Sequence, residues 1–373
     1  MARRLLLFAI LLTGCSTTTV TPPGSSSASA SASTGSSGTS TTSSTSGSSS
    51  GTSSASSTST SGTSGANTLA SHYPGDVGID SDPAVIWHEN FEEGTVAAVV
   101  ARYDDHSNDP GMQLVADVPP RSSGSASIKW TAGGSGANAT DVFKQLPDHD
   151  EIWARWYVKY QAGIPWHHTG VWIGGYNPSE TYPNPQAGLL PTGDDRFSVS
   201  IEPVFNVGAE PLRLDFYNYW MQMHSWMATP DPSTGTAYYG NSLVHQNAFT
   251  ADEGQWMCIE VHIKLNTDPS SATGGVLEVW KNDALVRSFG EQGALGYWLR
   301  DKFCPQSADG SECTDYPPDP GTTMIPLNLQ YRSTSNLHIN AFWPQNYITD
   351  TTTAGSVQYD DMVVATERIG CLQ

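Results

Sequence analysis

Positive charge is scarce in this sequence. It contains 17 Lys and Arg residues against 37 Asp and Glu, and its formal net charge at pH 7 is −20. A protein that binds nucleic acid through the phosphate backbone needs a basic face. The composition therefore argues against general nucleic-acid binding, and we expect no nucleic-acid partner.

Long apolar runs are also lacking. After residue 14 no run approaches the roughly 18 residues that a transmembrane helix needs, so we expect no segment to span a bilayer. The only apolar run at the N-terminus, residues 5–12, follows Arg3 and Arg4, which is typical of an export signal.

The end of that run carries a motif. Leu12-Thr13-Gly14-Cys15 resembles the bacterial lipobox, in which the Cys is acylated and becomes the new N-terminus. The resemblance implies a signal peptide over 1–14, lipidation of Cys15 and a place in the bacterial cell envelope. Ser16, rather than Asp, follows the Cys, which in such lipoproteins favours the outer membrane or cell surface. The alternative is an ordinary signal peptide with an accidental Cys.

Residues 16–66 contain no charged and no aromatic residue. Such a Ser/Thr/Gly-rich stretch cannot bury enough apolar surface to offset the entropy of ordering it, which predicts a disordered tether. We place the lipidated Cys and tether at 15–71 and one folded carbohydrate-active domain at 72–373. We expect a monomer whose only contact with a membrane is the N-terminal lipid.

The chain has only five Cys and no Cys-x-x-Cys pair of the kind that binds zinc. Apart from Cys15 an even number remains, which favours disulfides in an exported protein. Three pairings are possible. A local bridge between Cys304 and Cys313 is the simplest, and it leaves Cys258 with Cys371.

Helical periodicity is scarce as well, with one short helix possible near Ala294–Lys302. Short runs of alternating apolar and polar residues predominate instead, separated by Gly, Pro, Asn and Asp. Many short strands without intervening helices indicate an all-β fold, an antiparallel β-sandwich or jelly roll. The clearest runs are Ile152–Tyr160, Arg196–Phe205, Leu212–Tyr219, Trp256–Leu265, Val276–Lys281, Ile325–Tyr331, Leu337–Trp343 and Val357–Ala365.

Alternation separates the two faces of each strand. Phe197, Val199 and Ile201 point to the core in this assignment, and the residues between them point outward. Several strands then carry polar and aromatic side chains on the face away from the core. Such a face suits glycan binding, because polar groups bind hydroxyls and aromatic rings pack on sugar C–H surfaces. A merely solvated sheet face is the alternative.

Several blocks together resemble the concanavalin A-like lectin and glucanase jelly rolls, and in particular bacterial polysaccharide lyases of the alginate and glucuronan lyase type. The resemblance covers about residues 72–373. Its blocks are Tyr73–Ile79, Val85–Glu92, Arg155–Lys159, Trp256–Val261 and Tyr359–Ala365. Retaining glycosidases of this fold carry Glu-x-Asp-x-(x)-Glu along one strand, and that run is lacking here.

A lyase must neutralise a uronate carboxylate, remove the C5 proton and protonate the leaving oxygen. Tyr or His transfers the protons, and Arg, Asn, Gln or His supports the carboxylate. We expect one groove to hold Arg155, Tyr157, Arg213, Tyr217 and His168. The catalytic groups expected are Tyr217, His168, Arg155 and Arg213, and the substrate-binding groups are Tyr157, His167, Glu202, Asp215, Tyr219, Gln330, His338 and Asn340.

The sequence leaves other functions open. A non-catalytic glycan-binding lipoprotein would use the same face, a glycoside hydrolase would use Glu202 and Asp215, and a structural envelope protein would use neither. His167 and His168 would then be a structural pair, and the tyrosines ordinary strand packing. The net negative charge of the chain would repel an anionic substrate unless Arg155 and Arg213 form a local basic patch.

No cofactor is expected for the chemistry, but related folds bind a structural calcium ion. If the first and last strands pair, Glu92 approaches Asp361, and both are oxygen ligands of the type calcium prefers. Alternatively, Asp360 and Asp361 cap a turn or pair with Lys or Arg.

Overall fold

The structure is a computed structural model that describes residues 68–183, 187–205, 211–227, 237–290 and 294–373. The predicted signal peptide, Cys15 and nearly all of the predicted tether lie outside these residues. Within them, short antiparallel strands dominate and form two large sheets, which confirms the all-β sandwich. No helix in the described part of the chain is long and apolar enough to cross a membrane.

The first sheet has eight strands in the order β13-β12-β11-β6-β18-β4-β3, with β1 paired to β18. The first strand along the chain, β1, and the last, β18, are thus neighbours, as expected. The bounds are β1 Val85–Glu89, β3 Met112–Val115, β4 Ser127–Gly133, β6 Glu151–Tyr160, β11 Met257–Lys264, β12 Val276–Lys281, β13 Ala284–Phe289 and β18 Ala354–Ala365.

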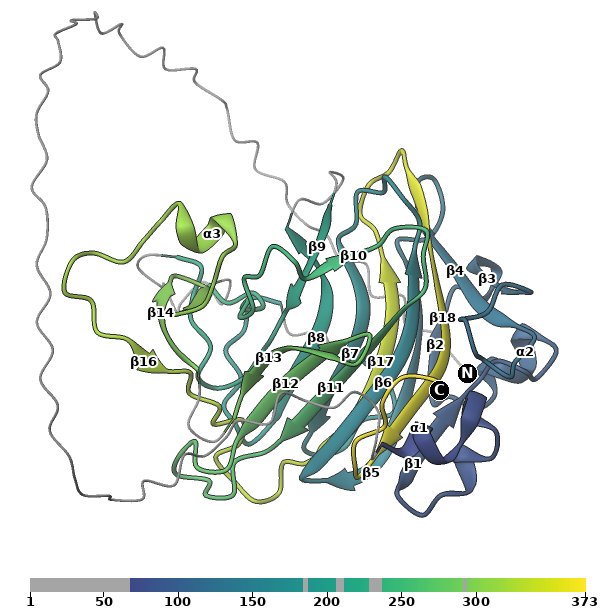
Figure 1. Ribbon diagram of the computed structural model, residues 1–373, viewed down its shortest axis with the longest axis horizontal. Coiled ribbons are helices and arrows are strands. Elements are labelled where there is room, and N and C mark those ends of the chain that lie inside the picture. The colour runs from purple at the N-terminus through teal and green to yellow at the C-terminus, as the bar shows by residue number, and fades with distance from the viewer. Residues whose placement is uncertain (1–67, 184–186, 206–210, 228–236, 291–293) are drawn as a thin grey trace, which may run out of the picture. The chain divides into compact units, whose positions relative to one another are not determined.

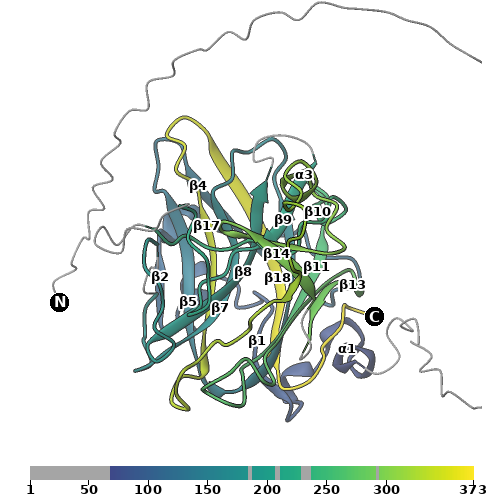
Figure 2. The same cartoon turned by 90° about the vertical axis from the view of Figure 1, so that its left-hand side faces the viewer.

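The second sheet has seven strands in the order β10-β9-β8-β7-β17-β5-β2. It lies face to face with the first sheet, as the two views in Figures 1 and 2 show. The bounds are β2 Asp105–Ser107, β5 Ala139–His149, β7 His168–Tyr176, β8 Arg196–Phe205, β9 Leu212–Phe216, β10 Thr250–Ala251 and β17 Ile339–Tyr347.

A small three-stranded sheet and α3 lie at one end of the sandwich, and α1 and α2 lie at the other (Figure 1). The strands are β14 Leu295–Leu299, β15 Lys302–Pro305 and β16 Ile325–Pro326. The helices are short: α1 Leu69–His72, α2 Val96–Val100 and α3 Ser311–Thr314, with single 3₁₀ turns at Pro74–Asp76, Ile79–Ser81 and Asp109–Gly111.

The core between the two large sheets follows the alternation in the sequence. Phe197, Val199 and Ile201 of β8 are buried in it, and Trp156 of β6 packs there from the opposite sheet. The predicted helix near Ala294–Lys302 is wrong. Leu295–Leu299 pairs instead with β15, because the tight turn at residues 300–301 returns the chain as a hairpin with Leu299 opposite Lys302.

Both disulfides are present with the expected pairing. Cys304 and Cys313 close a local loop with a Cα–Cα distance of 5.7 Å, and α3 lies in that loop. Cys258 and Cys371 join β11 to the C-terminus with a Cα–Cα distance of 6.0 Å. The C-terminal segment is also hydrogen-bonded to the start of the folded part, where Leu69 N donates to Arg368 O. The two ends of the described chain are therefore fastened to the same sheet.

Candidate functional site

The outer face of the seven-stranded sheet, which points away from the core, carries the candidate site. Side chains on neighbouring strands form rows across it, because strands pair in register. One row, the aromatic row, has Trp343 of β17 beside Trp172 of β7, and Trp172 beside Ser200 of β8. The Trp172 and Trp343 ring centroids are 5.7 Å apart. Tyr217 continues this row, since its N–H donates to the Ser200 carbonyl.

The next row is acidic. Register pairs place Asp141 of β5 beside Gln345 of β17, and Gln345 beside Gly170 of β7. A Cβ on Gly170 would lie 3.1 Å from the Cβ of Glu202 on β8, and Glu202 pairs with Asp215 of β9. This acid row therefore carries three carboxyl groups across five strands. At its middle, on β7, Gly170 has no side chain to cover the backbone of the sheet.

His168 is the first residue of β7 and lies two residues before Gly170, in the row next to the acid row. Its side chain points towards the acid row. Its Nδ1 lies 2.7 Å from Glu202 Oε1. Glu202 is buried and also accepts a hydrogen bond from the Ser200 hydroxyl at 3.2 Å. Because Nδ1 faces a carboxylate, the second ring nitrogen of His168 is the one left for a ligand. About a quarter of the His168 side chain (23%) is exposed, so a ligand can reach it.

Two tyrosines lie beside this pair. The Tyr217 ring centroid is 4.8 Å from that of His168, and the Tyr217 and Tyr219 hydroxyls are 3.5 Å apart. Burial raises the pKa of Tyr217 well above its usual value, and it raises the pKa of Tyr219 to about 12. Both phenols are therefore protonated at neutral pH and are positioned as proton donors.

His167 is exposed and lies against His168 and Tyr347, with ring centroids 4.1 and 5.3 Å away. The neighbouring rings remove part of the water around the His167 ring, and together with the adjacent His168 this lowers the pKa of His167 to about 4. His167 is therefore neutral at neutral pH. The structure thus brings together five of the residues expected from the sequence: His167, His168, Glu202, Tyr217 and Tyr219.

Arg213 and Asp215 lie on the same face, but their polar atoms form hydrogen bonds with other segments of the chain. Asp215 is fully buried and accepts hydrogen bonds from the backbone N–H groups of Leu243, Val244 and His245 at 2.7–2.8 Å. Arg213 Nη1 donates to both carboxylate oxygens of Glu312 on α3. These two side chains hold loops over the end of β9 and are not open to a ligand.

The expectation that Arg155 and Tyr157 share a groove with Tyr217 is wrong. Both lie on β6, which belongs to the other sheet. Arg155 is fully buried, pairs with Asp76 and donates to the Asp361 carbonyl at 2.7 Å. The Tyr157 hydroxyl accepts a hydrogen bond from Leu372 N. Alternation correctly placed both residues on a face away from the core, but the outer faces of the two sheets point in opposite directions.

Three further expected residues have structural partners elsewhere. The amide of Gln330 donates to the Pro269 carbonyl at 2.7 Å. His338 lies 2.7 Å from Asp150, which also binds Arg332. Asn340 accepts from Tyr176 N and donates to Tyr176 O. None of these contacts joins His168 and Tyr217.

The sequence reasoning missed Trp343, Gln345, Tyr347 and Asp141. The first three alternate along Ile339–Tyr347, with buried Phe342 facing the core, so their period-two spacing was the available signal. The predicted strand Leu337–Trp343 stops short of Gln345 and Tyr347. No local pattern distinguished Asp141 from other acids.

The candidate calcium residues lie near the bulge in β18. Burial raises the pKa of both Asp360 and Asp361, and the nearby Glu92 carboxylate raises it further. One oxygen of each Asp is buried without a hydrogen-bond partner among the described residues. The Glu92 oxygens accept hydrogen bonds from Ser125 and Ala126. The carboxylate oxygens of Glu92, Asp360 and Asp361 do not all lie within 4.8 Å of one another, so the unpartnered oxygens of Asp360 and Asp361 are the observation that fits a hard cation.

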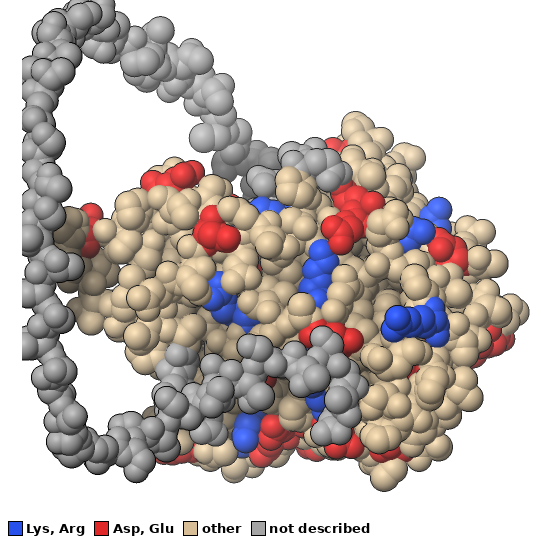
Figure 3. All heavy atoms as spheres, viewed as in Figure 1, with Lys and Arg blue, Asp and Glu red and all other residues tan. Residues whose placement is uncertain are grey.

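Basic side chains do not gather on the face shown in Figure 3. Lys and Arg are scattered there among acids and uncharged residues, with no continuous basic patch on the visible described surface.

No family model matches the chain, and no curated protein matches it. Among solved structures, it is similar to the marine PL-14 alginate lyase from Aplysia kurodai, with 12% identity and a TM-score of 0.49, over 76% of this chain and 99% of that one. It is also similar to the alginate lyase vAL-1 from Chlorella virus, with 13% identity and a TM-score of 0.41, over 69% and 91% of the two chains. It is similar as well to the endo-β-1,4-glucuronan lyase from the fungus Trichoderma reesei, with 15% identity and a TM-score of 0.38, over 71% of this chain and 91% of that one.

The names of these solved structures, alginate and glucuronan lyases, are of the kind that the sequence blocks resemble. What each of those proteins acts on is a property of that protein. For this chain, activity is inferred only from the side chains on the outer face of the seven-stranded sheet.

Proposed function

We propose that this protein cleaves a uronate-containing polysaccharide by β-elimination on the outer face of the seven-stranded sheet. One observation carries the proposal. His168 lies 2.7 Å from buried Glu202, and its ring faces Tyr217 with 4.8 Å between centroids. A base oriented by a carboxylate, next to a protonated phenol, is the pair of groups that an elimination needs.

In this proposal His168 is the base and Tyr217 is the acid. Glu202 holds the Nδ1–H of His168, so Nε2 takes the C5 proton of the sugar. The C5–H electron pair forms the C4–C5 double bond, and the C4–O bond breaks. Tyr217, whose pKa is raised by burial, gives its proton to the leaving oxygen. Trp343, which is partly exposed and packs against buried Trp172, supplies a flat apolar surface for the C–H face of a sugar.

A glycan-binding protein without catalysis is the second candidate. It is favoured by the aromatic row, which suits sugar binding whether or not a bond is broken. A hydrolase is less well supported, because Glu202 is bound to His168 and both Asp215 oxygens accept backbone N–H groups.

The experiment is to incubate the protein with alginate, glucuronan and pectic polymers, native and methyl-esterified, and to follow absorbance at 235 nm for the unsaturated product. We expect a rise on at least one polymer. No rise on any of them, together with retardation of the protein in a gel containing glycan, would establish the binding protein instead.

We propose that Cys15 is lipidated and fastens the protein to the bacterial cell envelope, on the evidence of the lipobox sequence alone. We further propose that Asp361, with Asp360 and Glu92, holds a structural calcium ion. The two buried carboxylate oxygens without partners support the calcium site.

A further inference from the structure

Arg196, the first residue of β8, lies on the same outer face of the sheet as Glu202. The two share that face because an even number of residues separates them and the residues of the opposite parity, such as Phe197, are in the core. Six residues correspond to about 20 Å at 3.3 Å per residue. A polymer that reaches from His168 to Arg196 would therefore lie along the length of β8.

The Arg196 guanidinium donates no hydrogen bond to any residue that the structure describes. Its Nε is buried without a partner, and its only ion pair within the described ranges is with Asp195. The 3.8 Å between Nε and Asp195 Oδ2 is too long for a hydrogen bond. Asp195 Oδ1 instead accepts hydrogen bonds from Thr192 N and Oγ1, at 3.0 and 2.9 Å. The N–H groups of Arg196 are thus left for a ligand, and 15% of its side chain is exposed.

A small hollow in the same face adjoins Arg196. Aromatic rings and small residues line it: Phe143, Trp172, Tyr176, Trp343, Gly174, Ala341 and Ser198. Tyr176 is the register partner of Arg196, so Arg196 lies in the row next to the hollow. The rings offer apolar surface of the kind that packs on the C–H face of a sugar.

Two hydrogen-bond donors at this hollow lack acceptors. The Ser198 hydroxyl and Trp172 Nε1 are buried and have no partner among the described residues. Ser198 is 5% exposed and Trp172 is 8% exposed. A buried donor without an acceptor costs free energy, which an acceptor atom of a ligand would recover. With Arg196 the set consists of a hydroxyl, an indole N–H and a guanidinium, and a carboxylate has the charge and the two acceptor oxygens that match a guanidinium.

We infer that the hollow and Arg196 bind a second uronate sugar of the polymer, remote from the bond that breaks, with the carboxylate of that sugar on the Arg196 guanidinium. This inference rests on the proposed function. It explains how an acidic protein binds a polyanion far from its catalytic groups, since Arg196 offers a cation that the fold does not use. Only a chain long enough to cover both His168 and Arg196 makes this contact, so the second site favours polymers over short oligosaccharides.

The first test compares Arg196→Gln with the parent on a long and a short substrate, at 235 nm and with full-length protein. The substrates are the polymer that the parent cleaves and the shortest fragment of it that the parent still cleaves. We expect kcat/KM on the polymer to fall about tenfold, the loss of one hydrogen bond to a charged group, and kcat/KM on the fragment to fall less than about twofold. The melting temperature should be unchanged. Equal losses on both substrates overturn the inference and leave the proposed function standing.

Lys129→Gln is the matched control. Lys129 lies on β4 in the other large sheet and is partly exposed, and its substitution removes the same charge. We expect this variant to cleave both substrates like the parent. A loss on the polymer as large as that of Arg196→Gln would reveal a general effect of net charge and overturn the inference.

A second test needs no cleavage. Retardation of the protein is measured in native gels that contain the uronan or the same polymer after its carboxyl groups have been reduced to alcohols. We expect the uronan to retard the parent and Lys129→Gln about equally, and Arg196→Gln less. The reduced polymer should retard all three alike. Ser198→Ala should also be retarded less by the uronan while keeping the parental melting temperature, because its hydroxyl has no partner in the described part of the fold.

The two tests separate the inference from the proposed function. If the parent cleaves no polymer, the proposed function is wrong, and the gels then decide the inference alone. Weaker retardation of Arg196→Gln by the uronan supports a carboxylate site at Arg196. Equal retardation of the parent, Arg196→Gln and Ser198→Ala overturns it.

Discussion

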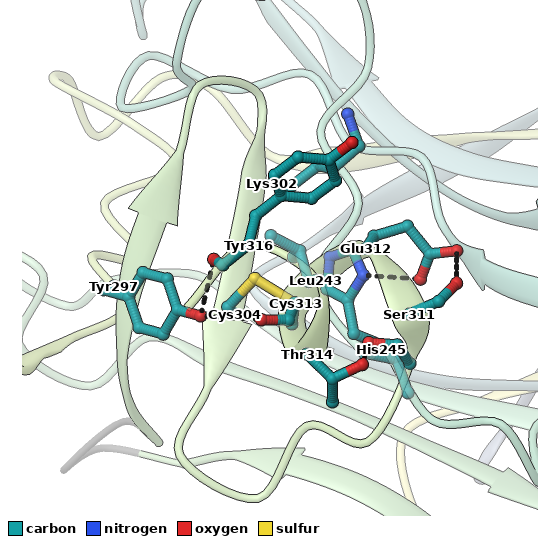
Figure 4. The surroundings of a disulfide bond; sticks show 12 residues. Leu243, His245, Tyr297, Lys302, Cys304, Ser311, Glu312, Cys313, Thr314 and Tyr316 are labelled. Carbon is teal, nitrogen blue, oxygen red and sulfur yellow. Dashed lines mark hydrogen bonds and ion pairs between the residues drawn. A yellow bond between two sulfur atoms is a disulfide. The ribbon is translucent and has the colours of Figure 1, made fainter. Parts of the chain in front are cut away.

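Arg213 on β9 donates hydrogen bonds from one guanidinium nitrogen to both carboxylate oxygens of Glu312 on α3, at 2.8 and 2.9 Å. His245 faces the same carboxylate, with 3.7 Å between its Nδ1 and Glu312 Oε2. Figure 4 shows Glu312 and His245 side by side, next to the Cys304–Cys313 disulfide. An ion pair of a sheet residue thus holds the disulfide loop over the end of β9, and Arg213 is a structural residue.

The first prediction concerns this pair. Burial alone would raise the pKa of Glu312, but hydrogen bonds from His245, the backbone and Arg213 lower it to about 2. A carboxyl group with a lowered folded pKa contributes stability above its unfolded pKa of about 4.5, and loses it as the pH falls towards about 2. Glu312→Gln should therefore lower the free energy of unfolding at pH 7 by about 1–3 kcal/mol.

Denaturant unfolding of parent and Glu312→Gln between pH 7 and pH 2.5 measures this. The difference between them should be constant down to about pH 4.5 and shrink below it. Glu367→Gln, at an exposed position, is the control and should track the parent throughout. A difference that does not change with pH would contradict the assignment.

The second prediction concerns the chemistry. His168→Ala and Tyr217→Phe should each lower kcat by about 10²–10⁴, the contribution of a positioned base or acid. Glu202→Gln should lower kcat by less, because it leaves the base in place and removes only its orienting partner. Thermal melts of each variant check that the fold is retained. If both His168→Ala and Tyr217→Phe keep parental kcat while folded, the roles proposed for them are wrong.

The third prediction separates Arg155 from the site. Arg155→Met leaves Asp76 buried without its charge partner, which should cost about 3–5 kcal/mol of stability. Adding Asp76→Asn should recover part of that loss. Lys159→Met is the matched control on the same strand, since its pair with Asp117 is partly exposed and should contribute less than about 1 kcal/mol. Unchanged stability in Arg155→Met would show that the pair is not structural.

The fourth prediction concerns calcium. An ion bound by the native state and not by the unfolded chain raises the melting temperature by mass action. The melting temperature should therefore be higher in millimolar calcium than in chelator, and the difference should disappear in Asp361→Asn. The same melting temperature in both media for the parent protein would rule out the site.

The fifth prediction concerns the anchor. Cys15→Ser should release the protein from membranes or leave its signal uncleaved, because it removes the thiol to which the proposed lipid is attached. Fractionation of cells expressing each form, with the N-terminus of the mature protein identified by mass spectrometry, measures this. A correctly cleaved mutant that still sediments with membranes would refute lipidation at Cys15.

Period-two alternation was enough to predict the all-β fold and the inward and outward sides of β8, because a sheet with one buried face requires it. The sequence left three disulfide pairings possible, and the simplest of them, with a local bridge between Cys304 and Cys313, is the one observed. Candidate residues contributed by one segment, such as His167 and His168, could be found from local composition.

Which sheet each strand joins was decided only by tertiary structure. Arg155 and Tyr217 look alike in the sequence, as polar or aromatic residues on outward faces, yet they lie on opposite sheets. Whether a polar side chain serves a ligand or the fold was likewise undetermined. Glu202 and Asp215 are register partners, but one orients a histidine while three backbone N–H groups from a distant loop surround the other. Local sequence sets the direction of a side chain, whereas its partners come from segments that only long-range packing brings near.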